Sequence, residues 1–232
     1  MKEGKVDVIQ EVYETLRSIR QHMEQEHPER KWLVEPATKY FELVHEGIMQ
    51  QRPMLWYFFM LAPEILRAMD VTVFSPEYAC GIIASLQSVN LKYVDIASEQ
   101  LPEDMCSVNK FPVGLALSGD TELPDMIIYA AANPCDAAIT AYSNLTHHYN
   151  IPGFYIDTPY LSDERGGEYV ANELKKMVSF IEEQTKQKLD WDRLREGIEY
   201  SNQAQRYMLK LNEVRKKLLM KNRVLTYSES GI

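Results

Sequence analysis

The chain has 232 residues, of which 45% are apolar and 25% charged, and its net charge is −9. These values are typical of a globular protein with its own core, and the negative charge excludes a general nucleic-acid binder, which needs basic side chains to neutralise phosphates. Three cysteines and an N-terminus without an apolar leader favour a reducing cytoplasm over a disulfide framework.

Two amphipathic helices are predicted at the N-terminus. Apolar residues recur at helical spacing from Val6 to Glu26 and again from Pro36 to Gln51. Neither stretch contains obvious chemistry, so residues 1–52 are interpreted as an N-terminal helical cap. The apolar run Met54–Ala62 that follows is far shorter than the ~20 residues of a membrane-spanning helix, and it is interpreted as core.

Residues 53–160 are predicted to form an α/β domain. Pro63 suits the first position of a helix, and the β-branched run Val71–Phe74 predicts a strand followed by a helix from Tyr78 to Val89. A further helix is expected to open near Pro102 or Asp104 and to end at Gly119.

The stretch Pro124–Pro159 predicts a β-α-β unit. Met126–Tyr129 reads as a buried strand and Phe154–Ile156 as a second strand, and a helix between them is expected to open at Asp136 and to end near Tyr149. Strands joined in this way are parallel, and ligands of such sheets bind beyond the carboxyl ends of the strands. The sequence therefore predicts a parallel, Rossmann-like sheet with its site at that edge.

Three residues follow the predicted strands and are expected at that edge: Glu77, Cys135 and Asp157. The dipole and free amides at a helix start favour the thiolate that binds metals, which makes Cys135 a candidate ligand. Glu77 and Asp157 would either bind a substrate group or cap a helix, and capping is the commoner use.

The cysteine pattern leaves two interpretations open. Cys106 and Cys135 are 29 residues apart, each at a predicted helix start, and are either two small core thiols or metal ligands. Cys80 lies among apolar residues within a helix, so core packing is its expected role. No GxGxxG, Walker or GxSxG motif is present in the sequence.

Residues 161–232 are predicted to be a C-terminal helical segment. One helix is expected from Asp163 to Gln184, and a long second helix is expected after Asp190. Apolar residues recur along one side of the long helix at Leu194, Ile198, Met208, Leu211, Val214 and Leu218. The absence of a closing strand suggests a chain that ends before a further domain.

Four ordered pieces of the chain resemble the 2-hydroxyacyl-CoA dehydratase and benzoyl-CoA reductase family, and in particular the D-component of 2-hydroxyglutaryl-CoA dehydratase. They are APEILRAMDVTVFSPEYA with its Pro-Glu, Cys106-Ser107 followed by Lys110 and Gly114, PDMIIYAAANPCD with IPGFYIDTPY, and the helical stretch from Glu168 to Ala204. Lys110 stands where many members have Arg. The resemblance covers only the N-terminal part of the family, whose second α/β domain is expected to be absent.

The resemblance implies a [4Fe-4S] cluster at the carboxyl edge, held by three cysteines. Cys106 and Cys135 match two of these ligands, and the third belongs to the second α/β domain. Cys80 matches no family ligand. Three alternatives remain for the third ligand: Cys80 substitutes for it, a partner contributes it, or the site is incomplete. Glu77 and Ser107 are expected to contact the substrate.

The implied function is an oxygen-sensitive 2-hydroxyacyl-CoA dehydratase subunit that acts through a ketyl radical, or a related acyl-CoA reductase, truncated and inactive alone. Its expected partners are an acyl-CoA substrate, a homologous second subunit and an ATP-dependent activator protein, in the cytoplasm of an anaerobe. The alternative is a structural or small-molecule-binding α/β module without a cluster.

Overall fold

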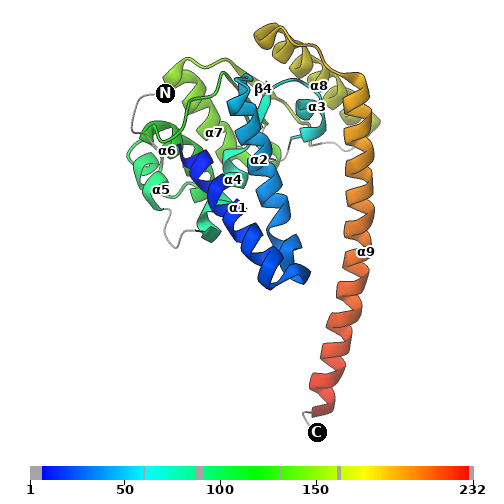
Figure 1. The fold of residues 1–232 in the computed structure, drawn as a ribbon. Helices are drawn as coiled ribbons and strands as arrows, with labels where there is room; N and C mark the ends of the chain where they lie inside the picture. The colour runs from blue at the N-terminus through cyan, green and yellow to red at the C-terminus, as the bar shows by residue number, and fades with distance from the viewer. Residues whose placement is uncertain (1–6, 60, 87–90, 131, 161–162, 230–232) are drawn as a thin grey trace.

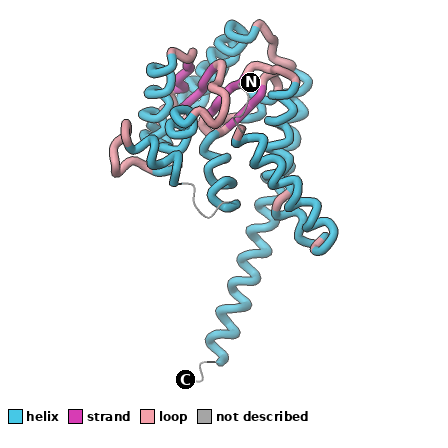
Figure 2. Tube along the Cα trace, turned by 60° about the vertical axis from the view of Figure 1, so that its left-hand side comes forward, coloured by secondary structure: helices cyan, strands magenta, loops and turns pink. Residues whose placement is uncertain are grey.

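The computed structural model of the chain describes residues 7–59, 61–86, 91–130, 132–160 and 163–229. The side chains of Leu91 and of residues 132–134 and 218–229 are outside this description. Four parallel strands form one sheet with the order β2-β1-β3-β4, and helices surround it (Figures 1 and 2). The predicted α/β fold with a parallel sheet flanked by helices is confirmed.

The four strands are short, and the first three along the chain are largely buried. They are β1 (Met54–Tyr57), β2 (Thr72–Phe74), β3 (Met126–Ala130) and β4 (Gly153–Ile156). Trp56 is paired with Phe74 of β2 on one side and with Ile127 of β3 on the other. From β1 the chain continues to one edge of the sheet, whereas from β3 it continues to the other, so ligands are expected where β1 and β3 end.

The connections contain α3 (Pro63–Arg67), α4 (Pro76–Leu86), α5 (Leu91–Ser98), α6 (Ser107–Ser118) and α7 (Ala132–Tyr149). Pro63 is at the first position of α3, as expected, and Gly119 ends α6 in the left-handed conformation with φ 67°. Helices α4 and α7 both pack against α6, and α7 also packs against β3.

The structure differs from the sequence-based expectation at the starts of α4, α6 and α7 and in one additional helix. Helix α6 starts at Ser107 with Cys106 as its N-cap, and not near Pro102 or Asp104. Pro76 starts α4, which places Glu77 in the first helical turn and not in the preceding loop. Helix α7 starts at Ala132, because a proline in a first turn removes only an N–H that has no intrahelical partner. Helix α5 was not expected at all, and the expected end of α4 at Val89 lies outside the described residues.

Helices α5 and α6 approach each other closely at Gly114. A Cβ atom on this residue would lie 1.7 Å from the backbone oxygen of Tyr93. Only glycine lets the two helices pack at this distance, because any side chain would meet backbone. The crossing fixes the direction of α6, whose N-terminus carries Cys106.

The N-terminal segment packs on the β2 side of the sheet. It consists of α1 (Val8–Glu26), a 3-10 turn (Pro28–Leu33) and α2 (Glu35–Met49). Asp7 caps α1 by accepting a hydrogen bond from the Ile9 amide at 2.9 Å. Helix α2 packs against β2, where Gly47 lies directly over Thr72. Buried residues from α1 and α2 belong to the same hydrophobic core as the sheet.

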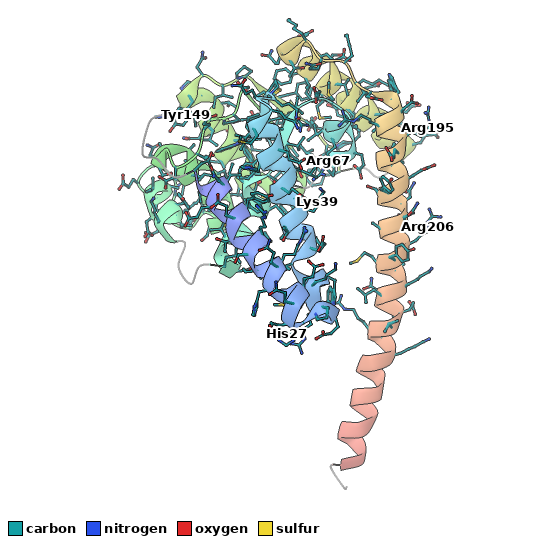
Figure 3. The ribbon with its side chains drawn as sticks, in the orientation of Figure 1. His27, Lys39, Arg67, Tyr149, Arg195 and Arg206 are labelled. Atoms are coloured by element: carbon teal, nitrogen blue, oxygen red, sulfur yellow. The ribbon has the colours of Figure 1, made fainter. Side chains whose placement is uncertain are left out.

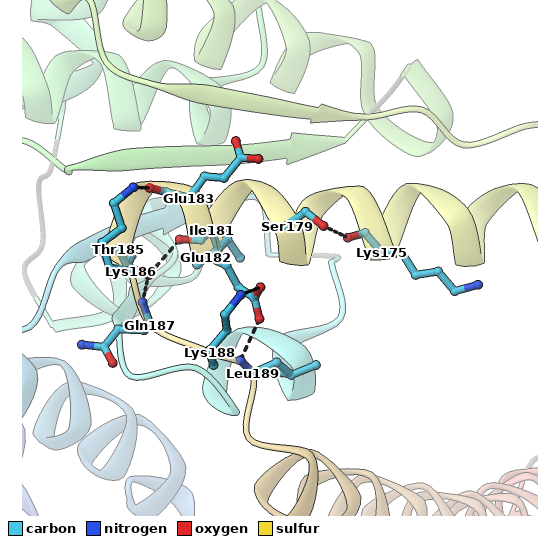
Figure 4. Close-up of polar contacts among 10 residues, drawn as sticks. All are labelled: Lys175, Ser179, Ile181, Glu182, Glu183, Thr185, Lys186, Gln187, Lys188 and Leu189. Atoms are coloured by element: carbon cyan, nitrogen blue, oxygen red, sulfur yellow. Dashed lines mark hydrogen bonds and ion pairs between the residues drawn. The ribbon is translucent and has the colours of Figure 1, made fainter.

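Two long helices follow β4: α8 (Glu164–Thr185), which Asp163 caps, and α9 (Trp191–Glu229). Figure 4 shows the turn between them. Lys186 ends α8 in the left-handed conformation, and Glu182 accepts hydrogen bonds from the Leu189 amide at 3.2 Å and from Lys188 Nζ at 2.5 Å. Asp190 caps α9 by accepting from the Asp192 and Arg193 amides, each at 3.0 Å. Within the described ranges no helix has the length and apolar content needed to cross a bilayer.

Candidate functional site

Three chain segments bring the predicted site residues to the carboxyl edge of the sheet. Ser75 and Glu77 follow β2, Cys135 lies at the start of α7 after β3, and Asp157 directly follows β4. Because all four strands are parallel, these segments lie at one edge. The expectation that Glu77, Cys135 and Asp157 share an edge is confirmed.

Glu77 is a buried carboxyl group, with only 5% of the residue exposed. Its Oε2 accepts a hydrogen bond from Ser75 Oγ at 3.2 Å. Ser75 is held in place by Tyr40 of α2, whose hydroxyl accepts a hydrogen bond from the Ser75 amide at 2.6 Å. Burial raises the pKa of Glu77 from 4.5 to about 7. At neutral pH this group is therefore divided between a proton donor and a proton acceptor.

Tyr142 of α7 is fully buried and lies beside Glu77. Its hydroxyl is near enough to lower the pKa of Glu77, although burial dominates and raises it. The contact is longer or less aligned than a hydrogen bond. Among the described residues, neither Tyr142 Oη nor Glu77 Oε1 has a hydrogen-bond partner. A buried polar atom without a hydrogen-bond partner is costly, so both atoms need an explanation beyond packing.

Cys106 and Cys135 lie at the N-terminal ends of α6 and α7. Cys106 is the exposed N-cap of α6, and its side chain makes no capping hydrogen bond. Its carbonyl accepts hydrogen bonds from the Asn109 and Lys110 amides at 3.0 Å each. Cys135 is half-buried. Asn109 connects the two helices: it lies one turn after Cys106, is 4% exposed, and donates from Nδ2 to Cys135 Sγ over 3.5 Å.

Cys80 is half-buried on α4, one turn after Glu77. Burial, the Glu77 carboxylate and the Cys106 thiolate together raise the pKa of the Cys80 thiol to about 11. Cys80 also packs against the hydrophobic core, as expected.

These residues fit an iron–sulfur cluster in their chemistry but do not form a completed ligand set. Thiolates at helix N-termini are the ligands that such clusters use, and the Asn109 amide supplies a hydrogen bond to one of the sulfurs. In the described part of the chain, however, no three His, Cys, Asp or Glu side chains are grouped as metal ligands. The thiols of Cys106 and Cys135 would therefore make up only part of the ligand set of such a cluster.

The remaining predicted residues differ in their contacts. Ser107 is exposed at the first position of α6. Lys110 is buried, and its Nζ donates to Ser98 Oγ at 3.1 Å and to the Glu103 carbonyl at 2.9 Å, which stabilises the segment before Cys106. Asp157 accepts a hydrogen bond from Tyr169 Oη at 2.8 Å, which connects the end of β4 to α8.

A hollow of the surface lies at the opposite edge of the sheet. It has a volume of about 820 Å³ and is open to solvent. Its lining includes residues at the amino ends of β1 and β3, namely Arg52, Met54, Asp125 and Met126. None of the predicted site residues lines it, so it is not the candidate site.

Sequence analysis did not identify Asn109 or Tyr142. Asn109 is separated by 26 residues from the Cys135 sulfur that it contacts, and only the packing of α6 on α7 brings them together. Tyr142 was predictable as a residue seven positions after Cys135 on the same helix face, but its approach to Glu77 depends on tertiary structure.

Comparison with known families gives one match. Residues 59–227 match the family model described as 2-hydroxyglutaryl-CoA dehydratase, D-component. This range includes Glu77, all three cysteines, Asn109 and Tyr142. A search of curated proteins finds no match.

Proposed function

Because the chain belongs to the 2-hydroxyglutaryl-CoA dehydratase D-component family, we propose that it is a subunit of an iron–sulfur 2-hydroxyacyl-CoA dehydratase. The observation that carries this proposal is the arrangement of the thiols of Cys106 and Cys135 at two neighbouring helix N-termini, connected by Asn109. The thioester of a 2-hydroxyacyl-CoA would be bound at the same edge of the sheet.

Cys106 and Cys135 are proposed to hold a [4Fe-4S] cluster. When bound, such a cluster would supply the single electron that lets a thioester lose a 2-hydroxyl group, a reaction that ordinary base catalysis does not achieve. Asn109 would orient the Cys135 sulfur and stabilise its negative charge through the Nδ2 hydrogen bond. A third ligand would come from Cys80 or from a partner subunit.

Glu77 is proposed to bind the substrate and to hold a proton at Oε1. Its pKa of about 7 suits transfer in either direction at neutral pH, and Ser75 keeps Oε2 fixed while Oε1 remains available. Ser107, exposed beside Cys106, would donate a hydrogen bond to a substrate oxygen. The buried aromatic surroundings of Glu77 would exclude water.

An electron of sufficiently low potential would be delivered by an ATP-dependent activator protein, and a homologous subunit would complete the enzyme. These partners are proposed from the family alone. Ring reduction of an aromatic acyl-CoA is the related reaction that the same residues would support.

The proposal is tested by anaerobic reconstitution of the purified chain with iron and sulfide, followed by iron and acid-labile sulfide determination and EPR of the reduced sample. Cluster-bound iron in the wild type, lost when both cysteines are replaced (C106S/C135S), supports it. An equal iron content in the double variant would contradict it.

The second candidate is a small-molecule-binding module without a cluster, favoured by the unsatisfied Glu77–Tyr142 pair and by the incomplete ligand set among the described residues. It predicts binding of an acyl-CoA by the metal-free chain, with an affinity that reconstitution leaves unchanged and that E77Q lowers.

A further inference from the structure

Helix α9 projects from the body of the molecule along most of its length (Figures 1 and 2). It is 39 residues long and packs against α3 near its start, whereas residues 198–217 are all exposed. The Asp190 amide donates to the Ala68 carbonyl at 3.1 Å, Gly197 lies over Glu64, and the Ser201 hydroxyl donates to the Glu64 carboxylate. For residues 202–217, all the polar contacts in the described structure stay within α9.

The exposed part of α9 carries a narrow apolar row at coiled-coil spacing. Ala204, Tyr207, Leu211 and Val214 alternate at intervals of three and four residues, and we call them the α9 seam. Tyr207, Leu211 and Val214 are 66%, 46% and 53% exposed. Gly197 precedes Ala204 by seven residues on the same face, so the seam continues the face that packs on α3.

A row of this kind is unusual on a free surface. Helices in proteins gain most of their stability from packing an apolar face, and contiguous exposed apolar residues mark interaction sites. Arg195 and Arg206, labelled in Figure 3, point away from the body of the molecule. The hydrogen bonds of the turn between α8 and α9, shown in Figure 4, set the direction of α9 and therefore the direction in which the seam faces.

The residues that flank the seam are mainly cationic. They are Met208, Lys210, Arg215 and Lys217. Residues 206–217 contain five basic side chains and one acidic side chain, although the whole chain has a net charge of −9. The net charge of the whole chain does not reveal this basic segment.

The flanking charges decide which partner fits. In a coiled coil the flanking positions of one helix face those of the other, so two α9 seams would bring Lys210, Arg215 and Lys217 against cations. A helix that lies on a membrane has a broader apolar face than a seam of this width. A partner helix with acidic flanks satisfies both the apolar row and the charges.

We propose that the α9 seam binds an α-helix of another polypeptide whose apolar row is flanked by Asp and Glu. The carboxylates of that helix would pair with Lys210 and Lys217 on one side of the seam and with Arg215 on the other. Its apolar row would pack against Tyr207 and Leu211 at the centre. This proposal does not depend on the reaction assigned to the carboxyl edge.

The test uses the full chain and two fluorescent peptides of three heptads each, with identical Leu rows. One peptide has Glu at every flanking position and the other has Lys. Fluorescence anisotropy is expected to show at least ten-fold tighter binding of the Glu peptide, with an affinity that falls as salt is raised. Equal binding of both peptides, or binding of neither, would overturn the proposal.

Matched variants separate the seam from general charge attraction. Leu211→Glu should weaken binding of the Glu peptide at least ten-fold, and the pair Lys210→Glu/Lys217→Glu should reverse the preference between the peptides. Lys216→Glu changes charge on the face away from the seam and should leave the preference intact. Self-association or binding to anionic vesicles that Leu211→Glu abolishes, without peptide binding, would assign the seam to those partners and refute the acidic helix.

Discussion

The Glu77 carboxyl group lies beside the Tyr142 hydroxyl in the interior of the protein, and each keeps an oxygen without a hydrogen-bond partner among the described residues. The two residues come from α4 and α7, the helices that also carry Cys80 and Cys135. A buried acid with a pKa of about 7 is thus placed in the layer of helices that carries the thiols. Perturbed acids of this kind concentrate at functional sites.

Glu77 should make the stability of the protein depend on pH. Its pKa is raised from 4.5 to about 7 on folding, so its stabilising contribution is present below pH 4.5 and is lost as pH rises through about 7. Glu77→Gln removes this dependence. From below pH 4.5 to above pH 7, the free energy of unfolding of the variant should therefore rise by on the order of 3 kcal/mol relative to that of the wild type. Urea unfolding of both proteins at pH 5 and pH 8 measures the difference, and parallel pH profiles would rule out the raised pKa.

Tyr142→Phe should raise the pKa of Glu77 further, because the hydroxyl lowers it. The variant should fold normally, since the hydroxyl that is removed has no hydrogen-bond partner in the described structure. Carboxyl infrared or NMR titration of Glu77 in the two proteins gives the shift directly. A lowered pKa in the variant would show that Tyr142 does not stabilise the carboxylate.

The three thiols should react with iodoacetamide at different rates in the metal-free chain. Only about one Cys80 thiol in a thousand is ionised at pH 8, because its pKa is about 11, and the thiolate is the reactive form. Cys106 is exposed and should be modified first, with Cys80 at least ten-fold slower. Peptide mapping by mass spectrometry measures each rate. Comparable rates would mean that Cys80 is more accessible, and less strongly perturbed, than the structure indicates.

Gly114→Ala should disrupt the packing of α5 on α6. The new methyl group would lie 1.7 Å from the Tyr93 carbonyl oxygen, so the expected loss of stability exceeds about 3 kcal/mol and should lower the melting temperature strongly. Gly81→Ala is the matched control on α4, because no atom lies within 4 Å of its new methyl group. The control should gain ~0.5–1 kcal/mol from helix propensity. Equal melting temperatures of the two variants would contradict the close approach.

Much of this architecture follows from local sequence. Asp190 precedes an apolar periodic stretch and caps α9 as expected, and the β-branched runs become β2 and β3. Helix α5 was missed because its first residues adjoin a stretch without periodicity. The start of α7 was placed four residues late because Pro134 was taken as a helix breaker.

The candidate site was predictable at the level of the sheet edge but not of its contacts. Parallel strands bring Glu77 and Cys135 to one edge by topology alone. The contacts of Asn109 with Cys135 and of Tyr142 with Glu77 depend on how α6 and α7 pack, which no local pattern encodes. The same holds for Tyr40, which reaches Ser75 from α2.

The central claim is that Cys106 and Cys135 bind one iron–sulfur cluster. Mössbauer spectroscopy and iron and sulfide content per chain after anaerobic reconstitution should be compared for the wild type, C106S, C135S and C80S. We predict a cluster in the wild type and in C80S, and loss of most cluster iron in both C106S and C135S. Retention of the cluster in either of those two variants, or its loss only in C80S, would contradict the assignment.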